Sequence, residues 1–425
     1  MDISTSSATE SFLEGVHRPL EGLVALELGG FITAPYAGLL LAEMGARVIK
    51  VEPPGQGDPF RAFQGGLYSP QFQAYNRNKE SLCVDLKHPE GRTIFYRLVE
   101  TADVVVQNFR PGTAATLGVA WTDLARIRRD LVYCSITGFG STGPYGQRPS
   151  YDTVAQAFSG LLSMTVDPEL PRVVGPAFAD GLTGLYAAYG ILAALFHRHR
   201  TGAGMHLEIT MLEATMAFLT EPFSQYFYSG YSPGPLTRPQ TSQSYAFVGS
   251  DGKALAIHLS SPEKFWNNLL RAIEAPQLAT DPRFATREAR LQNYLSLHAT
   301  LAPIFAHRPR AEWLVRLERE DVPAAPIYSI EEVVEDPQVR ELAICCTMEH
   351  PEMGKVGGLF APIHINGERV VTPIPPPVLG EQTERVLEGL GYSSSDILAL
   401  RQAKVIYVGG SAGNRDERGN VGGAP

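Results

Sequence analysis

The sequence predicts an α/β protein with two parts: a large domain built on a parallel, Rossmann-like sheet, and a smaller α+β domain. Apolar strand candidates alternate with helix candidates over about the first 200 residues, which is the order of a parallel sheet with right-handed crossovers. Composition then changes at residues 223–243, where Tyr, Ser, Pro and Gly accumulate, and this indicates a crossing into a second domain. We therefore expect a large domain of residues 1–225 plus 330–425, a small domain of residues 226–329, and disordered tails at residues 1–18 and 409–425.

The first half of the chain supplies the elements of the predicted sheet. Strand candidates lie at residues 23–28, 47–52, 82–86, 103–107, 131–137 and 205–209, and a strand-like run lies at 171–174. Helix candidates fill residues 34–44, 89–101 and about 181–198, and another begins near residue 212. Because ligands of parallel sheets bind at the carboxyl ends of strands, the loops that follow these strands are candidate sites.

The second half begins with an expected hairpin over residues 245–259, turning at Ser250-Asp251-Gly252. Helices are expected at about 261–273, 285–307, 310–320 and 330–335, with late helices beginning near 380 and 394. The long apolar helix at 181–198 is interrupted by Gly184 and Gly190, and we interpret it as a core helix rather than a membrane span.

Charge and cysteine content narrow the class of protein. The 425 residues include 36 Lys and Arg against 45 Asp and Glu, a formal net charge of −9, which argues against a nucleic-acid-binding protein. The four cysteines show no metal-ligand or disulfide spacing, so we expect no metal and a reduced, cytoplasmic protein. Residues 1–10 lack the basic start and apolar core of a secretion signal, and no membrane partner is expected.

A glycine-rich motif, G-x-G-x-x-G, spans Gly138 to Gly143 after a strand candidate. A dinucleotide site requires a helix to begin within this motif, but Pro144, Gly146 and Pro149 follow it. We therefore interpret it as a structural loop that lines a pocket. The sequence contains no G-x-S-x-G elbow and no Walker loop, which disfavours an α/β-hydrolase and a P-loop enzyme.

Asp180 lies at the junction between the strand-like run ending at Gly175 and the long helix candidate. Aspartate is a preferred N-cap residue and its charge is favoured at a helix start, so local sequence alone indicates a capping role. Gly181 and Gly184 leave open space beside the carboxylate, as a reactive group requires. Only the remainder of the chain can decide between the two roles.

Over residues 19–405 the chain resembles the class III coenzyme A-transferase family, of the CaiB/BaiF and formyl-CoA transferase type. Each shared motif is modest, but their order and spacing are together specific. The motifs include Gly45-Ala-Arg-Val-Ile-Lys-Val-Glu52, Asn78-Lys-Glu-Ser81, Asp85-Leu-Lys87, Ser150-Tyr-Asp152, Asp180-Gly181, Thr201-Gly-Ala-Gly204 and Leu379-Gly-Glu-Gln-Thr383.

The resemblance implies an enzyme that transfers CoA from an acyl-CoA to a free carboxylic acid, with succinyl-CoA or another dicarboxylyl-CoA as a plausible donor. Asp180 occupies the position of the catalytic carboxylate, which forms an aspartyl anhydride and then an aspartyl-CoA thioester. Coenzyme A is a substrate in this chemistry, not a permanently bound cofactor. The family also implies a homodimer with interlocked chains.

Matched positions imply which residues contact CoA. They are Ile32, Thr33, Val84, Leu86, Lys87, Asn108, Phe109, Arg110, Tyr151 and Asp152. Thr116 and Pro53 stand where other members carry basic residues, so the resemblance leaves Arg110, Arg77 or Lys79 to compensate.

The sequence leaves two groups open: the cation that pairs with a substrate carboxylate, and the donors to the oxyanion. Candidates for the cation are Arg172, Arg238 and Arg61, although each is more simply a structural residue. Candidates for the oxyanion donors are residues 241–244.

Two alternative functions remain beside CoA transfer. One is an α-methylacyl-CoA racemase, in which a His precedes the Asp of the motif at 150–152, but this chain has Tyr151 there. The pKa of a tyrosine side chain is ordinarily ~10, which makes tyrosine a poor general base at neutral pH, so the transferase is favoured. The other alternative is a non-catalytic acyl-CoA-binding protein.

Overall fold

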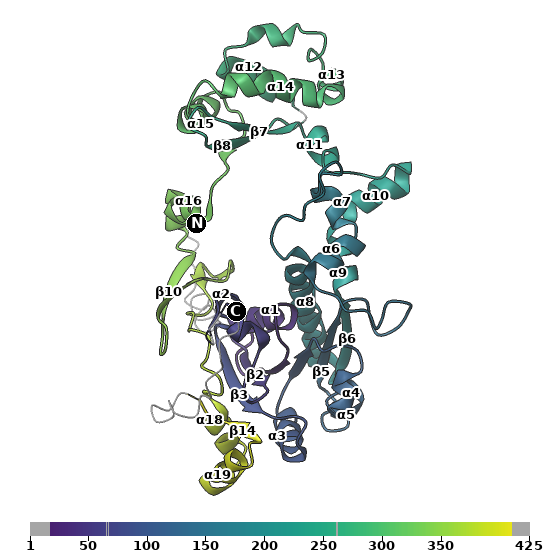
Figure 1. Ribbon diagram of the computed structural model, residues 1–425, viewed down its shortest axis with the longest axis vertical. Helices are drawn as coiled ribbons and strands as arrows, with labels where there is room; N and C mark the ends of the chain where they lie inside the picture. The colour runs from purple at the N-terminus through teal and green to yellow at the C-terminus, as the bar shows by residue number, and fades with distance from the viewer. Residues whose placement is uncertain (1–17, 65, 67, 261, 410–425) are drawn as a thin grey trace, which may run out of the picture. The chain divides into compact units, whose positions relative to one another are not determined.

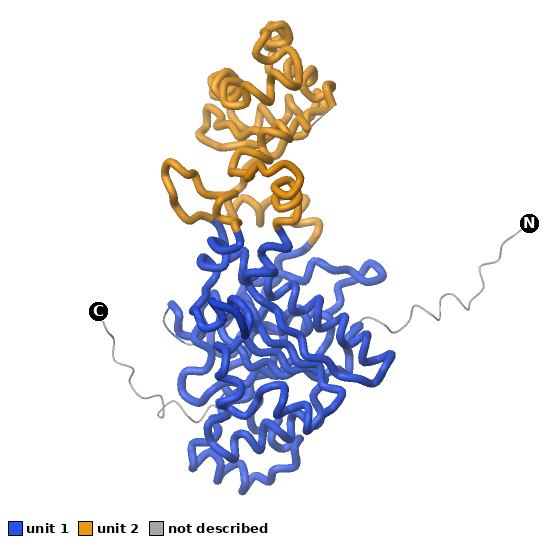
Figure 2. Tube along the Cα trace, turned by 90° about the vertical axis from the view of Figure 1, so that its right-hand side faces the viewer, with its two compact units in different colours: residues 1–159, 175–218, 343–425 blue, residues 160–174, 219–342 orange. Residues whose placement is uncertain are grey.

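The computed structural model describes residues 18–64, 66, 68–260 and 262–409 (Figure 1). The chain divides into two compact units: residues 1–159, 175–218 and 343–425 form unit 1, and residues 160–174 and 219–342 form unit 2 (Figure 2). The sequence placed the crossings at 225 and 330, whereas the units change at 218 and 342 and unit 2 also contains residues 160–174. The expected tails lie outside the described residues, apart from residues 18 and 409.

Unit 1 is built on a mostly parallel sheet whose described strands run in the order β14-β3-β2-β1-β4-β5-β6. All neighbours pair in parallel except β14, which is antiparallel to β3. Strands β3 to β6 in this order, 3-2-1-4-5-6, reproduce the doubly wound dinucleotide-binding topology, which confirms the predicted parallel sheet. The strands are β1 (Val24–Leu28), β2 (Arg47–Glu52), β3 (Lys79–Val84), β4 (Val104–Gln107), β5 (Val132–Thr137), β6 (Met205–Thr210) and β14 (Ile406–Tyr407).

Three strand expectations need correction. β3 begins at Lys79 rather than residue 82, because the polar side chains of Lys79 and Ser81 are buried beside β2 and Lys79 donates to the Pro35 carbonyl of α1. Residues 171–174 are exposed and form no strand, although their composition suggested one. β14 was not expected, since two residues at a sheet edge leave no periodic signal.

Helices cover both faces of this sheet. They are α1 (Thr33–Glu43), α2 (Pro70–Asn76), α3 (Pro89–Val99), α4 (Thr113–Thr116), α5 (Trp121–Leu124), α6 (Asp152–Phe158), α8 (Phe178–Thr201), α9 (Met211–Phe218), α18 (Thr383–Gly389), α19 (Ser394–Gln402) and the 3-10 turn η1 (Pro59–Ala62). Short hairpins β10 (Cys345–His350) with β11 (Gly354–Leu359) and β12 (His364–Ile365) with β13 (Glu368–Arg369) complete the unit.

Alternation along β1 shows how the two faces separate. Leu26 and Leu28 pack with α3 and with the late helices α18 and α19, whereas Ala25 packs with α1 and α8 on the opposite face. Successive side chains of a strand point to opposite faces, so one short apolar strand serves both cores. Helix α8 is long and apolar enough to cross a membrane by length and composition, but 44% of its most apolar window is buried, and it packs against α1, α9, β5 and β6.

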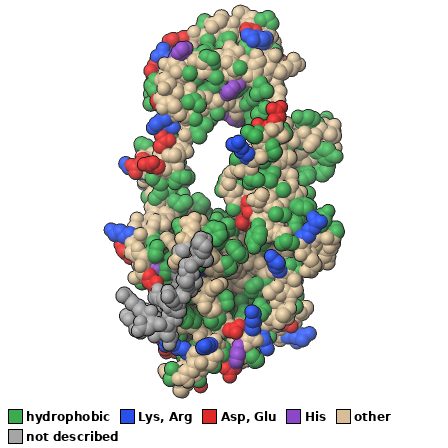
Figure 3. Space-filling view, in the orientation of Figure 1, with side chains coloured by type: hydrophobic (Ala, Val, Ile, Leu, Met, Phe, Trp, Pro, Cys, Tyr) green, Lys and Arg blue, Asp and Glu red, His purple; other side chains and the backbone are tan. Residues whose placement is uncertain are grey.

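Unit 2 contains the antiparallel sheet β7-β8-β9, which confirms the expected hairpin. Its elements are α7 (Leu161–Thr165), α10 (Thr220–Ser229), α11 (Thr237–Thr241), β7 (Ser244–Val248), β8 (Ala254–His258), α12 (Glu263–Ala272), η2 (Pro276–Ala279), α13 (Arg287–Gln292), α14 (Tyr294–Phe305), α15 (Arg310–Arg319), β9 (Ala324–Pro326), α16 (Ile330–Glu335) and α17 (Pro337–Glu341). The helix expected over 285–307 is two helices, because the chain turns at Asn293, whose side-chain amide donates to the carbonyl of Ala289. Hydrophobic side chains gather on the surface over α10 (Figure 3).

A fully buried charge cluster lies inside the parallel sheet. The Lys50 ammonium, in the middle of β2, is 2.7 Å from a carboxylate oxygen of Glu27 and 2.7 Å from one of Asp58. It also donates to the Gly29 carbonyl at 2.8 Å. Burial acts to lower the pKa of Lys50, but the neighbouring carboxylates outweigh burial and raise it. The ammonium therefore remains charged, and it ties β1, β2 and the loop containing Asp58 together.

We expect Lys50→Met to lower stability by about 3–5 kcal/mol, since it leaves the buried Asp58 carboxylate without its cation and removes one of the two cations that pair with Glu27. The midpoint of urea denaturation should fall correspondingly. Lys355→Met is the matched control, because Lys355 is exposed on β11 and should change stability by no more than about 0.5 kcal/mol. Equal midpoints for the two variants would contradict the structural role of Lys50.

Candidate active site

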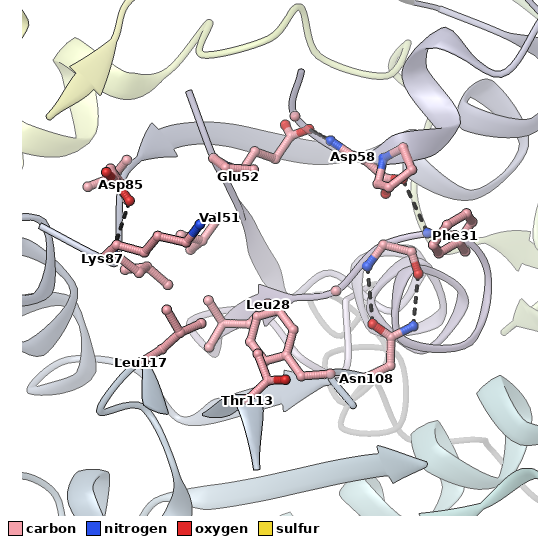
Figure 4. A pocket seen from close by; sticks show the side chains of 18 of the residues that line it. Leu28, Phe31, Val51, Glu52, Asp58, Asp85, Lys87, Asn108, Thr113 and Leu117 are labelled. Carbon is pink, nitrogen blue, oxygen red and sulfur yellow. Dashed lines mark hydrogen bonds between the residues drawn. The ribbon is translucent and has the colours of Figure 1, made fainter. Parts of the chain in front are cut away.

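A cavity of about 500 Å³ opens at the carboxyl ends of β1, β2, β3 and β4 (Figure 4). It lies where the strand order reverses, between β1 and β4, which is the position at which open α/β sheets bind ligands. The sequence-predicted residues that line it are Val84, Leu86, Lys87, Asn108, Phe109 and Arg110. The sheet thus gathers these residues, from two separate stretches of the chain, around one cavity.

The Asn108 side chain bridges the two sides of this switch point. Its amide oxygen accepts from the backbone N–H of Gly30 at 3.1 Å, and its amide nitrogen donates to the Gly30 carbonyl at 2.8 Å (Figure 4). The same nitrogen donates to the Thr33 hydroxyl at 2.9 Å. A Cβ on Gly29 would lie 2.5 Å from the Cβ of Ala34, so only glycine permits this close approach. Asn108 therefore fixes the loop after β1 as well as lining the cavity.

Asp58 holds the same loop from the other side. One carboxylate oxygen accepts from the N–H of Phe31 at 3.2 Å (Figure 4). The same oxygen accepts from the N–H of Phe60 at 2.8 Å, and the other oxygen pairs with Lys50. The N–H of Asp58 in turn donates to Glu52 at 3.0 Å. The buried charge cluster consequently sets the positions of two loops that form the cavity wall.

Lys87 and Arg110 are the cations at this cavity. Both are exposed at its lining, and neither forms an ion pair with any described residue, so both are free to meet phosphate groups. Arg77 and Lys79 do not compensate as the sequence suggested. Arg77 pairs with Glu43, and the buried Lys79 ammonium lies 2.8 Å from Glu27, on strand β3 away from the cavity mouth.

A second, smaller cavity of about 160 Å³ continues from the first, and Asp180 lines it. Phe31, Asn108, Phe109 and Arg110 line both cavities. The sequence-predicted residues Ile32, Thr33 and Tyr151 also line the smaller one. The two cavities are therefore adjacent, and a long ligand held in the larger one would extend toward Asp180.

Asp180 is not the N-cap of helix α8, contrary to the reading of the local sequence. The helix begins at Phe178 after Ala177, which has no capping side chain, and Asp180 is its third residue. The cap is supplied by Asp152 of α6, whose carboxylate accepts from the N–H groups of Ala179 at 2.9 Å and Asp180 at 3.3 Å. Asp152, which the resemblance placed at CoA, lines neither cavity and instead caps the start of α8.

The pKa of Asp180 is raised to about 7, first by burial and second by the negative charge of Asp152. A carboxyl group with this pKa is only partly ionised near neutral pH. Shifts of this kind cluster at functional sites, and here the shifted group opens into a cavity. The geometry suits a carboxylate that reacts, because it is held at a helix start and has open space beside Gly181.

The loop of Gly138 to Gly143 has the predicted role. No helix begins within the motif, and Gly138 lines the smaller cavity. A Cβ on Gly138 would lie 2.3 Å from the Cβ of Ser150, so the glycine allows this loop to approach the segment that carries Tyr151. The Tyr151 ring then packs edge-on against Phe31, with centroids 5.9 Å apart.

One residue of the smaller cavity was not predicted from the sequence. Arg148 lines the smaller cavity together with Asp180, and it forms no ion pair with a described residue. Arg61, a predicted partner for a substrate carboxylate, forms a buried ion pair with Glu52 at 2.7 Å. Arg172 and Arg238, like residues 241–244, belong to unit 2. The loop position of Arg148, five residues after Gly143, was the only signal that could have drawn attention to it.

Comparisons with known proteins agree on one family. The family described as CoA-transferase family III matches residues 20–383. The chain is 32% identical to succinyl-CoA–D-citramalate CoA-transferase of Chloroflexus aurantiacus, over 91% of this chain and 98% of the relative. It is 35% identical to succinate–glutarate CoA-transferase of Agrobacterium fabrum, over 88% and 96%. A solved CaiB/BaiF family protein from Brucella suis is 34% identical, with a TM-score of 0.79 over 88% of this chain and 99% of that one.

The cap provided by Asp152 can be tested at the two amides that it accepts from. We expect Asp152→Ala to cost about 1 kcal/mol of local stability, or about fivefold faster hydrogen exchange at Ala179 and Asp180. Asp152→Asn keeps an acceptor oxygen and should change exchange far less. Exchange resolved by mass spectrometry over residues 176–185 measures this, and identical rates in the two variants would rule out the capping role.

Proposed function

The chain belongs to CoA-transferase family III and is an acyl-CoA:carboxylate CoA-transferase, and we propose that Asp180 carries the transfer covalently. The observation that supports this most directly is the position of Asp180, in a small cavity that continues from the larger cavity at the switch point. The larger cavity suits the nucleotide of CoA, with Lys87 and Arg110 toward its phosphates. The pantetheine arm then leads past Phe31 and Asn108 to the carboxylate.

The reaction needs one carboxylate and no redox partner. An Asp180 oxygen attacks the thioester carbonyl, the C–S bond breaks, and CoA leaves as the thiolate from a mixed anhydride. The thiolate attacks the aspartyl carbonyl, which releases the first acid as its carboxylate and leaves an Asp180–CoA thioester. The acceptor carboxylate attacks that thioester to form a second anhydride and free thiolate. Attack of the thiolate on the new acyl carbonyl gives the product acyl-CoA and restores Asp180.

The side chains of this site assist each step in a definite way. Asp152 anchors the start of α8 and so fixes the position of Asp180. The positive end of α8 favours the ionised Asp180 carboxylate, which is restored at the end of the cycle. Burial keeps this carboxylate poorly solvated and therefore reactive. Holding thiolate and anhydride in one cavity makes the return attack intramolecular, which accelerates it strongly.

A dicarboxylyl-CoA such as succinyl-CoA is the proposed donor. Relatives named for succinyl-CoA, glutarate and D-citramalate support this choice. Arg148 is the group best placed to meet the second carboxylate, since it lines the smaller cavity without an ion-pair partner among the described residues.

The active form is proposed to be a cytoplasmic homodimer. Large apolar side chains exposed on α10 support an interface, among them Phe227 at 77% and Tyr228 at 94% exposure. Light scattering of the purified protein tests the dimer.

Two alternatives make different demands on the site. A racemase needs a second acid or base at the α-carbon, and the residue in that position is Tyr151, an exposed side chain packed on Phe31. A racemase would also exchange the α-proton of an acyl-CoA with deuterium when no acceptor acid is present. A binding protein would hold acyl-CoA but would be indifferent to loss of the Asp180 carboxylate.

We expect Asp180→Ala and Asp180→Asn to lower the transfer rate by at least about 10³-fold, because the nucleophile is lost. Binding of CoA, measured by calorimetry, should change little. Asp167→Asn, which alters an exposed carboxylate, serves as the control and should keep full activity. Hydroxylamine added during turnover should label Asp180 alone. Near-normal transfer by either Asp180 variant, or a label on another residue, would contradict the covalent mechanism.

The pH dependence follows from the raised pKa of Asp180. Attack requires the ionised carboxylate, so kcat/KM for acyl-CoA should rise about tenfold per pH unit below 7 and level off above it. Asp152→Asn removes the like charge and should move the midpoint to lower pH, while the contribution of burial remains. A profile that is flat between pH 5 and 8, in wild type and variant alike, would contradict this assignment.

A further inference from the structure

A third opening lies within unit 1, apart from the two cavities assigned to CoA. It is a groove of about 870 Å³, formed by α1, α2, α8, the β10–β11 hairpin and the loop that follows the hairpin. It is larger than either cavity assigned to CoA. The transfer chemistry described above does not yet use it.

The groove begins at the catalytic residue. Gly181, the neighbour of Asp180 in sequence, lines it, and a Cβ placed there would meet no atom within 4 Å. Tyr75 lines the groove as well, and its pKa is raised by burial and next by the charge of Asp180. Asp180 lines the smaller CoA cavity, and the residue that follows it lines the groove.

Most residues that line the groove are apolar. Leu185, Ala188 and Leu192 follow Gly181 on one stripe of α8, and Met44 of α1 and Phe360 lie among the other lining residues. At 1.5 Å per residue, the stripe from residue 181 to residue 192 is about 16 Å long. This length accommodates an extended alkyl chain of medium length or an aryl tail.

The groove offers no free cation for a second carboxylate. Among the described lining residues, the charged side chains are Glu43 and Arg77, and these two form an ion pair with each other. The Arg77 guanidinium also donates to the Ala74 carbonyl at 2.9 Å. A short dicarboxylic acid would therefore place its second charge against apolar side chains, which is unfavourable.

From this geometry we infer that the groove binds the apolar tail of the carboxylic acid whose carboxyl group reacts at Asp180. The substrate class is a monocarboxylic acid with a medium-length alkyl or aryl tail, together with its CoA ester. This inference rests on the proposed function, because the groove matters only if the acid reacts at Asp180. It extends that function by separating an apolar acceptor, held in the groove, from a dicarboxylyl donor, held near Arg148.

Acceptor chain length is the decisive measurement. With succinyl-CoA as donor, kcat/KM for acetate, butyrate, hexanoate, octanoate and decanoate should rise about fourfold per methylene buried, until the groove is filled. Glutarate should be a poorer acceptor than hexanoate. A flat series, or a preference for glutarate over hexanoate, would overturn the inference while leaving transfer at Asp180 intact.

Two tryptophan substitutions make the test positional. Leu192→Trp blocks the far end of the groove and should lower kcat/KM for decanoate at least tenfold more than for butyrate. Leu185→Trp lies closer to Asp180 and should move the limit to shorter acids still. Both side chains are partly exposed, so tryptophan can be accommodated by the fold. Leu398→Trp, on the exposed face of α19, is the control and should leave the length profile unchanged.

The outcomes separate the two hypotheses. Loss of all transfer in Asp180→Ala together with an unchanged length profile in both tryptophan variants would refute the groove alone. Retained transfer in Asp180→Ala would refute the proposed mechanism. If either tryptophan variant changes the molecular mass in light scattering without changing the length profile, the groove is covered by a second copy of the chain, and the inference is wrong.

Discussion

The buried ammonium of Lys50 is the contact on which the site depends. A cation in the middle of a buried strand is costly unless it is surrounded by opposite charge, and here Glu27 and Asp58 supply that charge at 2.7 Å each. The arrangement joins β1 to β2 and holds the loop after each strand. Because these loops form the wall of the cavity at the switch point, the shape of the cavity depends on the buried ion pairs of the sheet.

The start of helix α8 shows a second constraint, in which stability and reactivity oppose one another. Asp152 satisfies two backbone N–H groups that the helix itself leaves free, and this stabilises the segment that carries Asp180. The same carboxylate is a negative charge close to a second one, and it adds to the effect of burial on the pKa of Asp180. A neutral capping residue would satisfy the same N–H groups without repelling the Asp180 carboxylate. The charged Asp152 caps the helix but raises the pKa of Asp180, which is therefore less ionised near neutral pH.

The openings near Asp180 differ in chemical character, and the proposed mechanism uses this difference. Lys87 and Arg110 are exposed at the cavity on the carboxyl edge of the sheet, where we propose that CoA binds, and the groove along α1 and α8 is mostly apolar. An acyl-CoA thioester is divided in the same way, with a highly charged nucleotide at one end and an acyl group at the other.

The sequence by itself determined much of this protein. The alternation of apolar strands and helices predicted the parallel sheet, the dipeptide Asp251-Gly252 marked the hairpin, and the proline after the glycine motif excluded a dinucleotide loop, because each of these signals is local. Whole-chain motif order directed attention to Asp180. Tertiary structure alone decided what surrounds it. Asp152 caps a helix that begins 26 residues later, Arg61 is buried against Glu52, and the groove joins α8 to residues beyond 340. Such contacts depend on which strands become neighbours and which charges become buried together, and neither is written in the spacing of residues along the chain.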